Sequence, residues 1–383
     1  LKRTHPHLFA FERVFISAGD LKKIRQTVET IDAIRDRAAY RDVALAGVAE
    51  PARIDPRTRG VFNSYDFHLT ADGPALIEIN TNAGGGFLAA AAAAAHVECC
   101  TVQSGADMPQ PDDFASQVAD MFEHEWHLAG RDGPLETIVI VDDDPAAQFL
   151  YPDFLLAGAK LRAAGYKVQI ADARELVFAD GELRLDGERV DFVYNRLTDF
   201  GLEEERHGAL RAAVQSDAAV VSPHPFHHAL LADKRNLVRL TDPHFWEICG
   251  LKAAERTVLA DIPRAEMVSE INAERLWADR KNQFFKPVCG HGSKGVYRGD
   301  KLTKSAWAQI VERDYIAQRR VNPSKRKVRV DGEDVMLKTD IRAFTYGSEL
   351  LLIAARLYQG QVTNMRTPAG GFAPVSIGCQ VGQ

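Results

Sequence analysis

The sequence lacks long hydrophobic runs and is poor in cysteine. No apolar stretch approaches the roughly 18 residues that a membrane-spanning helix needs, so we expect neither a membrane span nor a membrane partner. The chain has 383 residues and only 5 cysteines; Cys99 and Cys100 are adjacent, and no CxxC spacing occurs. This usage predicts reduced thiols and a cytoplasmic location, because a disulfide framework or a zinc site requires regularly spaced cysteines.

Positive charge does not dominate the sequence either. The chain carries 47 Lys and Arg against 53 Asp and Glu, which gives a net charge of −6. Because polyanion-binding proteins usually present a basic face, we expect no nucleic acid partner. The basic run PSKRKVR at 323–329 has no interleaved aromatic residues, so it indicates a solvated loop or a clamp for an anionic substrate.

The chain is too long for one hydrophobic core, and its pattern changes along its length. An amphipathic helix is predicted within 11–40, and the turn ADGP joins two predicted strands within 62–80. From 136 to 222 strands alternate with helices, which predicts a small doubly wound sheet. A dinucleotide-binding domain is the alternative there, but no GxGxxG follows the first strand. We therefore expect an α/β (α+β) protein with three parts, 1–130, 131–225 and 226–383.

Oxygen-bearing side chains occur on the predicted hairpin YDFHLTADGPALIEIN. Asp66 and Glu78 lie on its two strands, and Glu78 and Asn80 share a face because side chains alternate with period two. Opposed acids repel unless a cation lies between them, and Mg²⁺ prefers oxygen ligands. The sequence therefore predicts a magnesium site made of Asp66, Glu78 and Asn80. A surface hairpin with solvated carboxylates is the alternative.

A glycine-rich loop follows a strand in FFKPVCGHGSKGVYRG. Glycines let consecutive backbone N–H groups converge on an anion, and lysine adds positive charge, so this segment predicts a phosphate site. It is not a P-loop, since GxxxxGK[ST] is absent and a strand follows. A flexible hairpin loop is the alternative. The candidate nucleotide-binding residues here are Lys286, Gly290, Gly292, Ser293, Lys294 and Gly295.

Three further patterns favour an anionic ligand. In DYIAQRRV a short apolar stretch runs into polar residues at the end of a strand, which would provide the apolar slot and the backbone donor and acceptor that an adenine ring needs. Lys234 lies near a predicted helix start. Arginines offer rigid donor forks for carboxylate and phosphate oxygens, and several occur in the C-terminal segment. Alone, each of these is more typical of an ordinary edge strand or surface ion pair. The candidate catalytic arginines are Arg342, Arg356 and Arg366.

Together, these motifs resemble the circularly permuted ATP-grasp superfamily, of which the glutathionylspermidine synthetase-like ligases are an example. Ordinary members carry the E-x-N metal motif last, whereas here it precedes the lysines. The resemblance covers about 60–96 and 220–375, and 136–222 is similar to the accessory domain that precedes the nucleotide site. It implies an ATP-grasp fold in circularly permuted order with a small doubly wound pre-ATP-grasp domain.

The resemblance also implies an activity and roles for residues. Lys234 and Lys286 would contact the α- and β-phosphates of ATP, and the loop Gly290–Gly295 would cover the γ-phosphate. The adenine ring would lie against the backbone of Ile316, Ala317 and Gln318, and the predicted magnesium ligands would hold Mg²⁺. The implied enzyme is an ATP-dependent ligase that activates a carboxylate as an acyl phosphate, which an amine then attacks. Its substrates would be small-molecule or peptide carboxylates and amines. A small-molecule kinase and a nucleotide-binding protein without turnover are the alternatives.

Two details of the resemblance concern single positions. Many members carry arginine two residues before the metal-binding aspartate, whereas this chain has Ser64, so Arg356 or Arg366 would replace it. The glycines Gly84–Gly86 precede the alanine run Ala89–Ala95, which predicts a helix. Because a helix N-terminus favours anions, we expect these glycines to admit the carboxylate substrate to its N–H groups.

Overall fold

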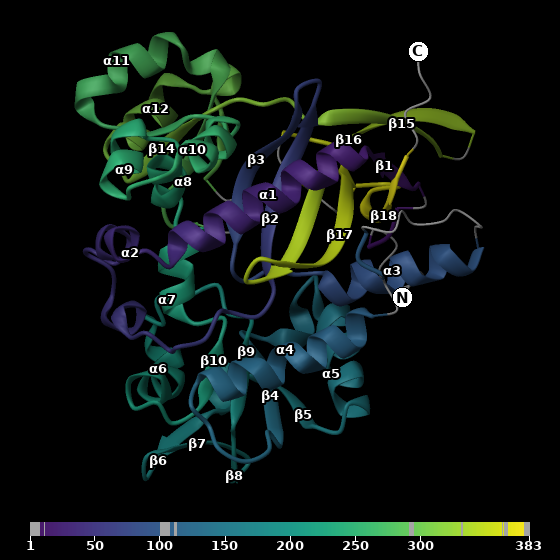
Figure 1. Ribbon diagram of the computed structural model, residues 1–383, viewed down its shortest axis with the longest axis vertical. Helices are drawn as coiled ribbons and strands as arrows, with labels where there is room; N and C mark the ends of the chain where they lie inside the picture. Colours follow the sequence, from purple (N-terminus) through teal and green to yellow (C-terminus); the bar gives the residue numbers. More distant parts are fainter. Residues whose placement is uncertain are drawn as a thin grey trace.

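The computed structural model describes residues 8–10, 12–99, 108–110, 113–290, 295–330, 332–361, 363 and 367–378. A seven-stranded main sheet combines strands from the beginning and the end of the chain (Figure 1). β2 (Asn63–Thr70) pairs with β16 (Glu333–Tyr346) in antiparallel register, and β15 (Ser324–Val330) lies beyond β2 on the same side of β16. The strand order is β1 (Val14–Ile16), β18 (Gly371–Ile377), β17 (Glu349–Tyr358), β16 (Glu333–Tyr346), β2 (Asn63–Thr70) and β3 (Gly73–Asn80), with β15 (Ser324–Val330) paired to β16.

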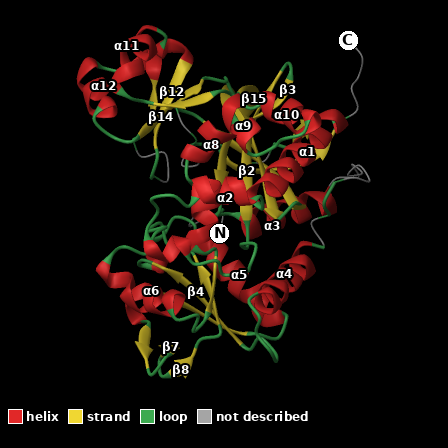
Figure 2. Ribbon diagram, turned by 60° about the vertical axis from the view of Figure 1, so that its left-hand side comes forward, coloured by secondary structure: helices red, strands yellow, loops and turns green. Residues whose placement is uncertain are grey.

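A parallel sheet and its helices form a separate layer at the lower end of the molecule (Figure 2). Its four strands are all parallel, and apolar cores lie on both faces, as predicted for a small doubly wound sheet. The strand order is β10 (Val220–Ser222), β9 (Phe192–Asn195), β4 (Thr137–Asp142) and β5 (Lys167–Asp172). Its helices are α4 (Phe114–Leu128), α5 (Tyr151–Ala163) and α6 (Gly208–Gln215), and a three-stranded ribbon of β6 (Val177–Ala179), β7 (Glu182–Leu185) and β8 (Glu188–Arg189) lies beside it.

A four-stranded antiparallel sheet, here called the outer sheet, lies at the opposite end of the molecule (Figure 2). Its strand order is β11 (Ala265–Met267), β14 (Tyr315–Arg319), β12 (Gln283–Pro287) and β13 (Tyr297–Arg298). The helices of this part are α8 (Arg235–Leu240), α9 (Pro243–Ile248), α10 (Ala253–Ala260), α11 (Glu270–Ala278) and α12 (Lys304–Val311). A short helix, α7 (Pro225–His227), leads into it from the parallel sheet.

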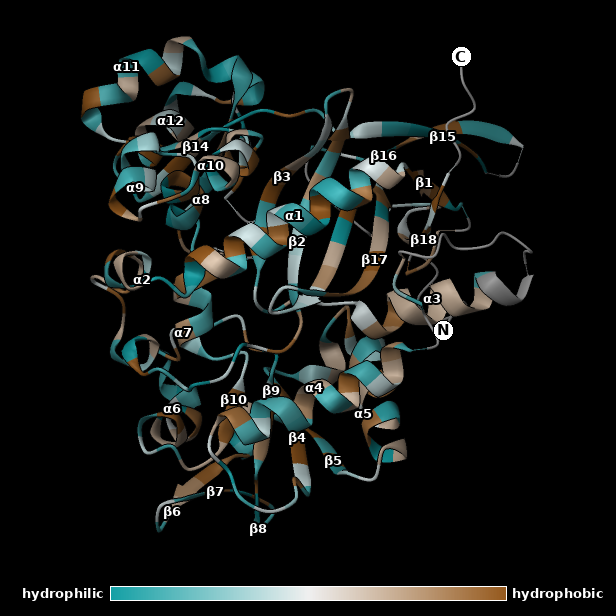
Figure 3. Cartoon of the chain, viewed as in Figure 1, coloured by the Kyte–Doolittle hydropathy of each residue, from teal (hydrophilic) through white to brown (hydrophobic). Residues whose placement is uncertain are grey.

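The two faces of the main sheet have different functions in the fold. Helix α1 (Ala18–Arg35) crosses one face, and α2 (Ala38–Ala44) follows it (Figure 1). Leu21, Ile24 and Val28 of α1 are buried with Ile341 of β16, and the alternation of polar and apolar bands along α1 is visible in Figure 3. The other face packs partly on α3 (Gly86–Cys99) and carries the polar side chains of the site. No helix of the described residues is long and apolar enough to cross a membrane.

Gly85, directly before α3, lies close against the main sheet. Its φ is +89°, and a Cβ there would lie 1.9 Å from Cζ of Phe372 on β18. Gly84 is similar, because a Cβ would lie 2.4 Å from a methyl carbon of Leu150. These glycines are thus required for packing of the chain against itself.

We expect Gly85→Ala to destabilise the protein by about 3 kcal/mol or more, from a positive φ and a forced shift of Phe372. Gly133→Ala is the matched control, since its φ is +83° and nothing lies within 4 Å of its Cβ position. The control should lose only about 1–2 kcal/mol. Urea unfolding measures both, and equal losses would contradict the packing role.

Candidate active site

A buried carboxylate on β2 holds two arginines from the end of the chain. Asp66 is 1% exposed, and Arg342 donates to both of its oxygens, Nε to Oδ1 and Nη2 to Oδ2, at 2.7 Å each. Nη2 of Arg356 lies 2.9 Å from Oδ2, and its Nε donates to Asp340 at 2.7 Å. Burial alone would raise the pKa of Asp66, but the two guanidinium groups outweigh it and lower that pKa to about 2. Asp66 is therefore a carboxylate at neutral pH.

A second group of charges surrounds Glu78, which lies directly opposite Asp66 in the β2–β3 register. Oε1 of Glu78 is 3.4 Å from Nζ of Lys234, and that Nζ donates to the carbonyl of Gly290 at 3.0 Å. Burial would raise the pKa of Glu78, but Lys234 and Lys286 outweigh it and lower it below its usual range. The side chain of Glu78 is still 34% exposed, so it faces a cleft.

Lys286 lies between the outer sheet and the main sheet. It extends from β12, and its Nζ donates to the carbonyl of Ile77 on β3 at 2.8 Å. Burial lowers the pKa of Lys286 to about 8, although Glu78 opposes this shift. An anion bound beside this amine would favour its charged form. The structure therefore brings together both predicted lysines and the predicted carboxylates, although they are far apart in the sequence.

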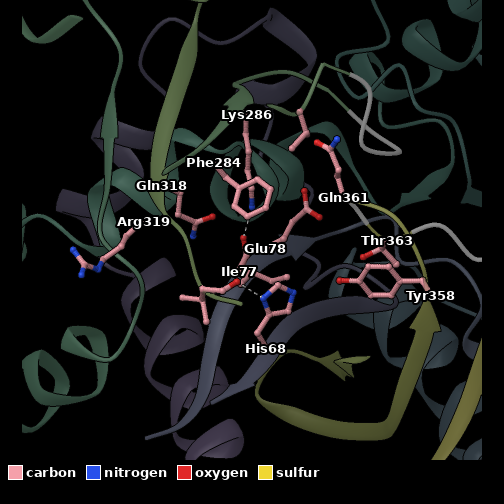
Figure 4. Close-up of a pocket in the computed structure, with 12 residues that line it drawn as sticks. His68, Ile77, Glu78, Phe284, Lys286, Gln318, Arg319, Tyr358, Gln361 and Thr363 are labelled. Carbon is pink, nitrogen blue, oxygen red and sulfur yellow. Dashed lines mark hydrogen bonds between the residues drawn. The ribbon is translucent and has the colours of Figure 1, made fainter. Parts of the chain in front are cut away.

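A cleft of about 610 Å³, here called the outer cleft, opens between the outer sheet and the main sheet (Figure 4). Phe284 and Val296 give it apolar walls, and Glu78 and Lys286 lie in it. Gln318 also lines it, is 2% exposed, and its Nε2 has no hydrogen-bond partner in the described part of the chain. A buried donor left unpaired costs free energy unless a ligand accepts from it. The lining of this cleft, with apolar walls beside buried polar and charged groups, suits the base and phosphates of a nucleotide.

The predicted adenine contacts at Ile316 and Ala317 need correction. β14 is an inner strand of the outer sheet, so the backbone at both positions pairs with β11 on one side and β12 on the other. Neither residue lines the outer cleft, and both are at most 1% exposed. Their backbone groups are therefore committed to the sheet, and Gln318 contributes through its side chain.

A larger cleft of about 1180 Å³, the inner cleft, lies between the main sheet and the loops of the parallel sheet. Glu78 lines both clefts, and Asn80, Lys234 and Arg342 line the inner one. The opposite wall includes Arg196, which follows β9 directly.

Arg196 and Asp142 are two residues of this wall that the sequence analysis missed. Arg196 is 6% exposed, and its Nε and Nη1 have no hydrogen-bond partner in the described residues. Its guanidinium lies over the ring of Tyr194, 5.2 Å from the centroid. Burial raises the pKa of Asp142, at the end of β4, to about 6. Both residues end parallel strands, and polar residues directly after such strands are the signal that could have identified them.

The predicted anion site at the start of α3 is wrong. The carboxylate of Asp153, on α5, accepts from the backbone N–H of Gly85 and of Leu88 at 3.0 Å each. Asp153 is 2% exposed and fills the position that was expected for a substrate carboxylate. The helix N-terminus thus binds an anion that belongs to the chain itself.

The other residues singled out in the sequence lie in different places relative to the two clefts. Arg342 lines the inner cleft, whereas Arg356 is 7% exposed and is held behind it between Asp66 and Asp340. Ser64 is fully buried and lines neither cleft. Gly290 is near the junction of the clefts, and Gly295 has φ +71°. Outside the described residues lie Gly292, Ser293, Lys294 and Arg366.

The donors at the junction of the clefts fit a hard divalent cation. Glu78 supplies a carboxylate, and Asn80 donates its Nδ2 to Asp66 at 3.2 Å, which leaves its amide oxygen as an acceptor. Asp66 fits less well as a ligand, because arginines surround it and its Oδ2 already receives Arg342 and Asn80. The described residues contain no group of three or more His, Cys, Asp or Glu side chains placed for a metal. Mg²⁺ commonly takes one or two carboxylates together with nucleotide phosphates and water.

No protein-family model matches this sequence, and no curated protein matches it. Among solved structures, the chain is similar to a glutathione synthetase-like effector from Globodera pallida, with a TM-score of 0.61 and 15% identity over 96% of this chain and 90% of that one. It is also similar to a putative gamma-glutamylcysteine synthetase from Methylobacillus flagellatus KT, with a TM-score of 0.54 and 10% identity over 96% and 90% of the two chains. At these identities the similarity concerns the fold alone: this chain shares the α/β fold of these two structures, which agrees with the predicted α/β (α+β) class.

We expect Asp66→Asn to destabilise the protein by about 3–5 kcal/mol at pH 7, because two buried guanidinium groups lose their carboxylate. Asp36→Asn is the control: Asp36 also pairs with Arg35, Arg41 and Arg59, but its side chain is 39% exposed, so its loss should cost no more than about 1 kcal/mol.

The effect of Asp66→Asn should depend on pH with a definite sign. The folded-state pKa of Asp66 is lowered, so its contribution is fully present above the unfolded value of about 3.9 and is lost as the pH falls through about 2. Urea unfolding at pH 7 and pH 3 measures this. A loss at pH 7 no larger than that of the Asp36 variant would contradict a stabilising role for the buried ion pair.

Proposed function

We propose that this protein is an ATP- and Mg²⁺-dependent ligase that joins a carboxylate to an amine through an acyl phosphate. The observation that carries this proposal is that Glu78 lines both clefts, so a nucleotide and a second ligand would meet at one carboxylate. Its substrates would be small molecules or peptides. The strand order of the main sheet fits a circularly permuted ATP-grasp protein, with the predicted parts 1–130 and 226–383 contributing to one sheet.

The outer cleft would hold ATP. Gln318 would donate its unpaired amide N–H to the base, and Phe284 would pack on it. Lys286 and Lys234 would hold the phosphates, since both ammonium groups lie near Glu78. Gly290, whose carbonyl accepts from Lys234, begins the predicted glycine-rich loop. Glu78 and Asn80 would hold Mg²⁺, which neutralises phosphate charge when bound.

The inner cleft would hold the carboxylate substrate. One carboxylate oxygen attacks the γ-phosphorus, ADP leaves, and an acyl phosphate forms; an amine then attacks its carbonyl carbon, and phosphate leaves as the amide forms. The protein must bring two anions together, and Arg342, Lys234 and Lys286 lower their repulsion. Asp66 would not bind the cation itself. It would fix Arg342 and Asn80 in position through its hydrogen bonds.

Arg196 indicates what the carboxylate substrate carries at its far end. A buried guanidinium with two unpaired nitrogens matches an anionic group, and Asp142 in the same wall matches an amine. An amino acid or a small peptide provides both. We therefore propose that the inner cleft binds an amino-acid-like substrate. The end that carries the amine and the second anionic group would lie against the parallel sheet, away from the reacting carboxylate.

The proposed reaction is tested by trapping the acyl phosphate. Incubation with ATP, Mg²⁺, hydroxylamine and a panel of amino acids and dipeptides should give a hydroxamate with release of phosphate. Glu78→Ala should lower this rate by about 100-fold or more. Glu274→Ala, which changes an exposed carboxylate on α11, is the control and should leave the rate unchanged.

Two results would contradict the ligase proposal. A phosphorylated product without hydroxamate would indicate a kinase. Stabilisation by Mg²⁺ and ATP in thermal unfolding, with no turnover of any compound of the panel, would indicate a nucleotide-binding protein without turnover.

We expect Arg196→Gln to raise KM for the trapped carboxylate by about tenfold while kcat stays within about threefold, because the group binds ground state and transition state alike. Arg189→Gln, an exposed arginine on the same domain that pairs with Asp191, is the matched control. Steady-state kinetics decides this. An unchanged KM would exclude Arg196 as the anchor.

A further inference from the structure

A fully buried histidine links two loops of the parallel sheet. His207 ends the short turn Glu205–His207 before α6 and is 0% exposed. Its Nδ1 lies 2.7 Å from Oδ2 of Asp199, and its Nε2 lies 2.9 Å from Oδ1 of Asp143. Both ring nitrogens therefore face carboxylate oxygens.

This geometry suits only the doubly protonated ring. A neutral imidazole carries one N–H, so it would turn a lone pair toward one of the two carboxylates. Burial lowers the pKa of His207, but the bonds to Asp199 and Asp143 outweigh it and raise that pKa above its usual range. Asp199 matches this: burial raises its pKa, but the bond from His207 and backbone N–H groups bring it below the usual range.

The two loops that His207 joins are the wall of the inner cleft. Asp143 directly follows Asp142, and its carbonyl accepts from Gln148 at 2.7 Å; Asp142 and Gln148 both line that cleft. Asp199 lies between Thr198 and Phe200, which line it too. The first loop follows β4 and the second follows the neighbouring parallel strand β9.

We propose that His207 is a positioning residue whose imidazolium fixes the distance between these two loops, so that loss of its proton loosens the cleft wall and weakens substrate binding without impairing the chemical step. His207 does not line the inner cleft, and the catalytic groups proposed above lie on the other wall. The consequence for substrate affinity rests on the proposed function, whereas the consequence for the loops does not.

Other charged groups surround the histidine and share its environment. Arg206 pairs with Asp143 at 3.2 Å and with Glu204 at 2.5 Å, and the backbone N–H of Glu204 donates to Asp199. On the neighbouring turn Ala173–Glu175, Arg174 is held by Asp172, which also accepts from the backbone N–H of Asp144. Apart from the histidine, these groups are Asp143, Asp144, Asp172, Arg174, Glu175, Asp199, Glu203, Glu204 and Arg206. Carboxylates outnumber guanidinium groups among them, which favours a positive ring.

The contacts of His207 with Asp143 and Asp199 are here called the latch. Two measurements test it without any substrate. In NMR spectra of ¹³C-labelled histidine, the ring of His207, assigned by its loss in His207→Gln, should titrate above the usual range of a histidine. Hydrogen exchange, corrected for intrinsic rates, should be slow at 143–150 and 197–201 while the ring is charged and at least about fivefold faster above its titration. In His207→Gln it should be fast at every pH.

Kinetics then connects the latch to binding. KM for the carboxylate identified by trapping should rise about fivefold or more as His207 loses its proton, with kcat unchanged, and His207→Gln should abolish this dependence. His127→Gln is the control and should behave as the wild type. If His207→Gln does not fold, Asp143→Asn serves instead, and it should move the titration of His207 to lower pH.

The outcomes separate the two proposals. A ring that is neutral at pH 7, or loop exchange that does not follow its titration, would overturn the latch. A KM that is independent of this titration would overturn its effect on binding. Failure to trap any acyl phosphate, with titration and exchange as expected, would overturn the proposed function and leave the latch intact.

Discussion

The ion pairs of Asp66 are the interaction on which the rest of the site depends. One carboxylate from β2 binds arginines from β16 and β17, so strands from the beginning and the end of the sequence meet at a single buried charge. Asp66 holds Arg342 at the inner cleft, and Asp340 together with Asp66 pairs Arg356 behind it. Removal of one partner from such a buried cluster costs more than any single hydrogen bond, because uncompensated charge stays in a poorly polarisable interior.

The charged groups of the site differ in how completely the protein itself compensates their charge. Asp66 is fully compensated, Glu78 is partly exposed between two lysines, and Lys286 has a depressed pKa. A site of this kind is incompletely neutralised without a ligand, and the unpaired amide of Gln318 adds a polar group that lacks a partner. A bound ligand with anionic and polar groups would neutralise the remaining positive charge and pair with the amide of Gln318.

Sequence patterns predicted the parts of this protein that depend on local geometry. The turn ADGP and period-two alternation suffice to place Asp66 opposite Glu78, and alternating strands and helices suffice for the parallel sheet. They could not show that β14 is an inner strand, since the neighbours of a strand are set by long-range pairing, and so Ile316 and Ala317 were assigned free backbone groups. For the same reason Asp153 could not be foreseen at the start of α3, from which it is far in sequence. Arg196 was detectable in principle, because it is the polar residue that ends a predicted strand of the parallel sheet.

The pairing of β2 with β16 has a consequence for biosynthesis. As the ribosome releases the polypeptide, the hairpin of β2 and β3 emerges early with one edge bare, and its partner strand follows more than 250 residues later in the order of translation. The parallel sheet, which is contiguous from Thr137 to Ser222, can complete itself in the meantime. The nascent hairpin must therefore stay soluble with an exposed strand edge until the last segments are made.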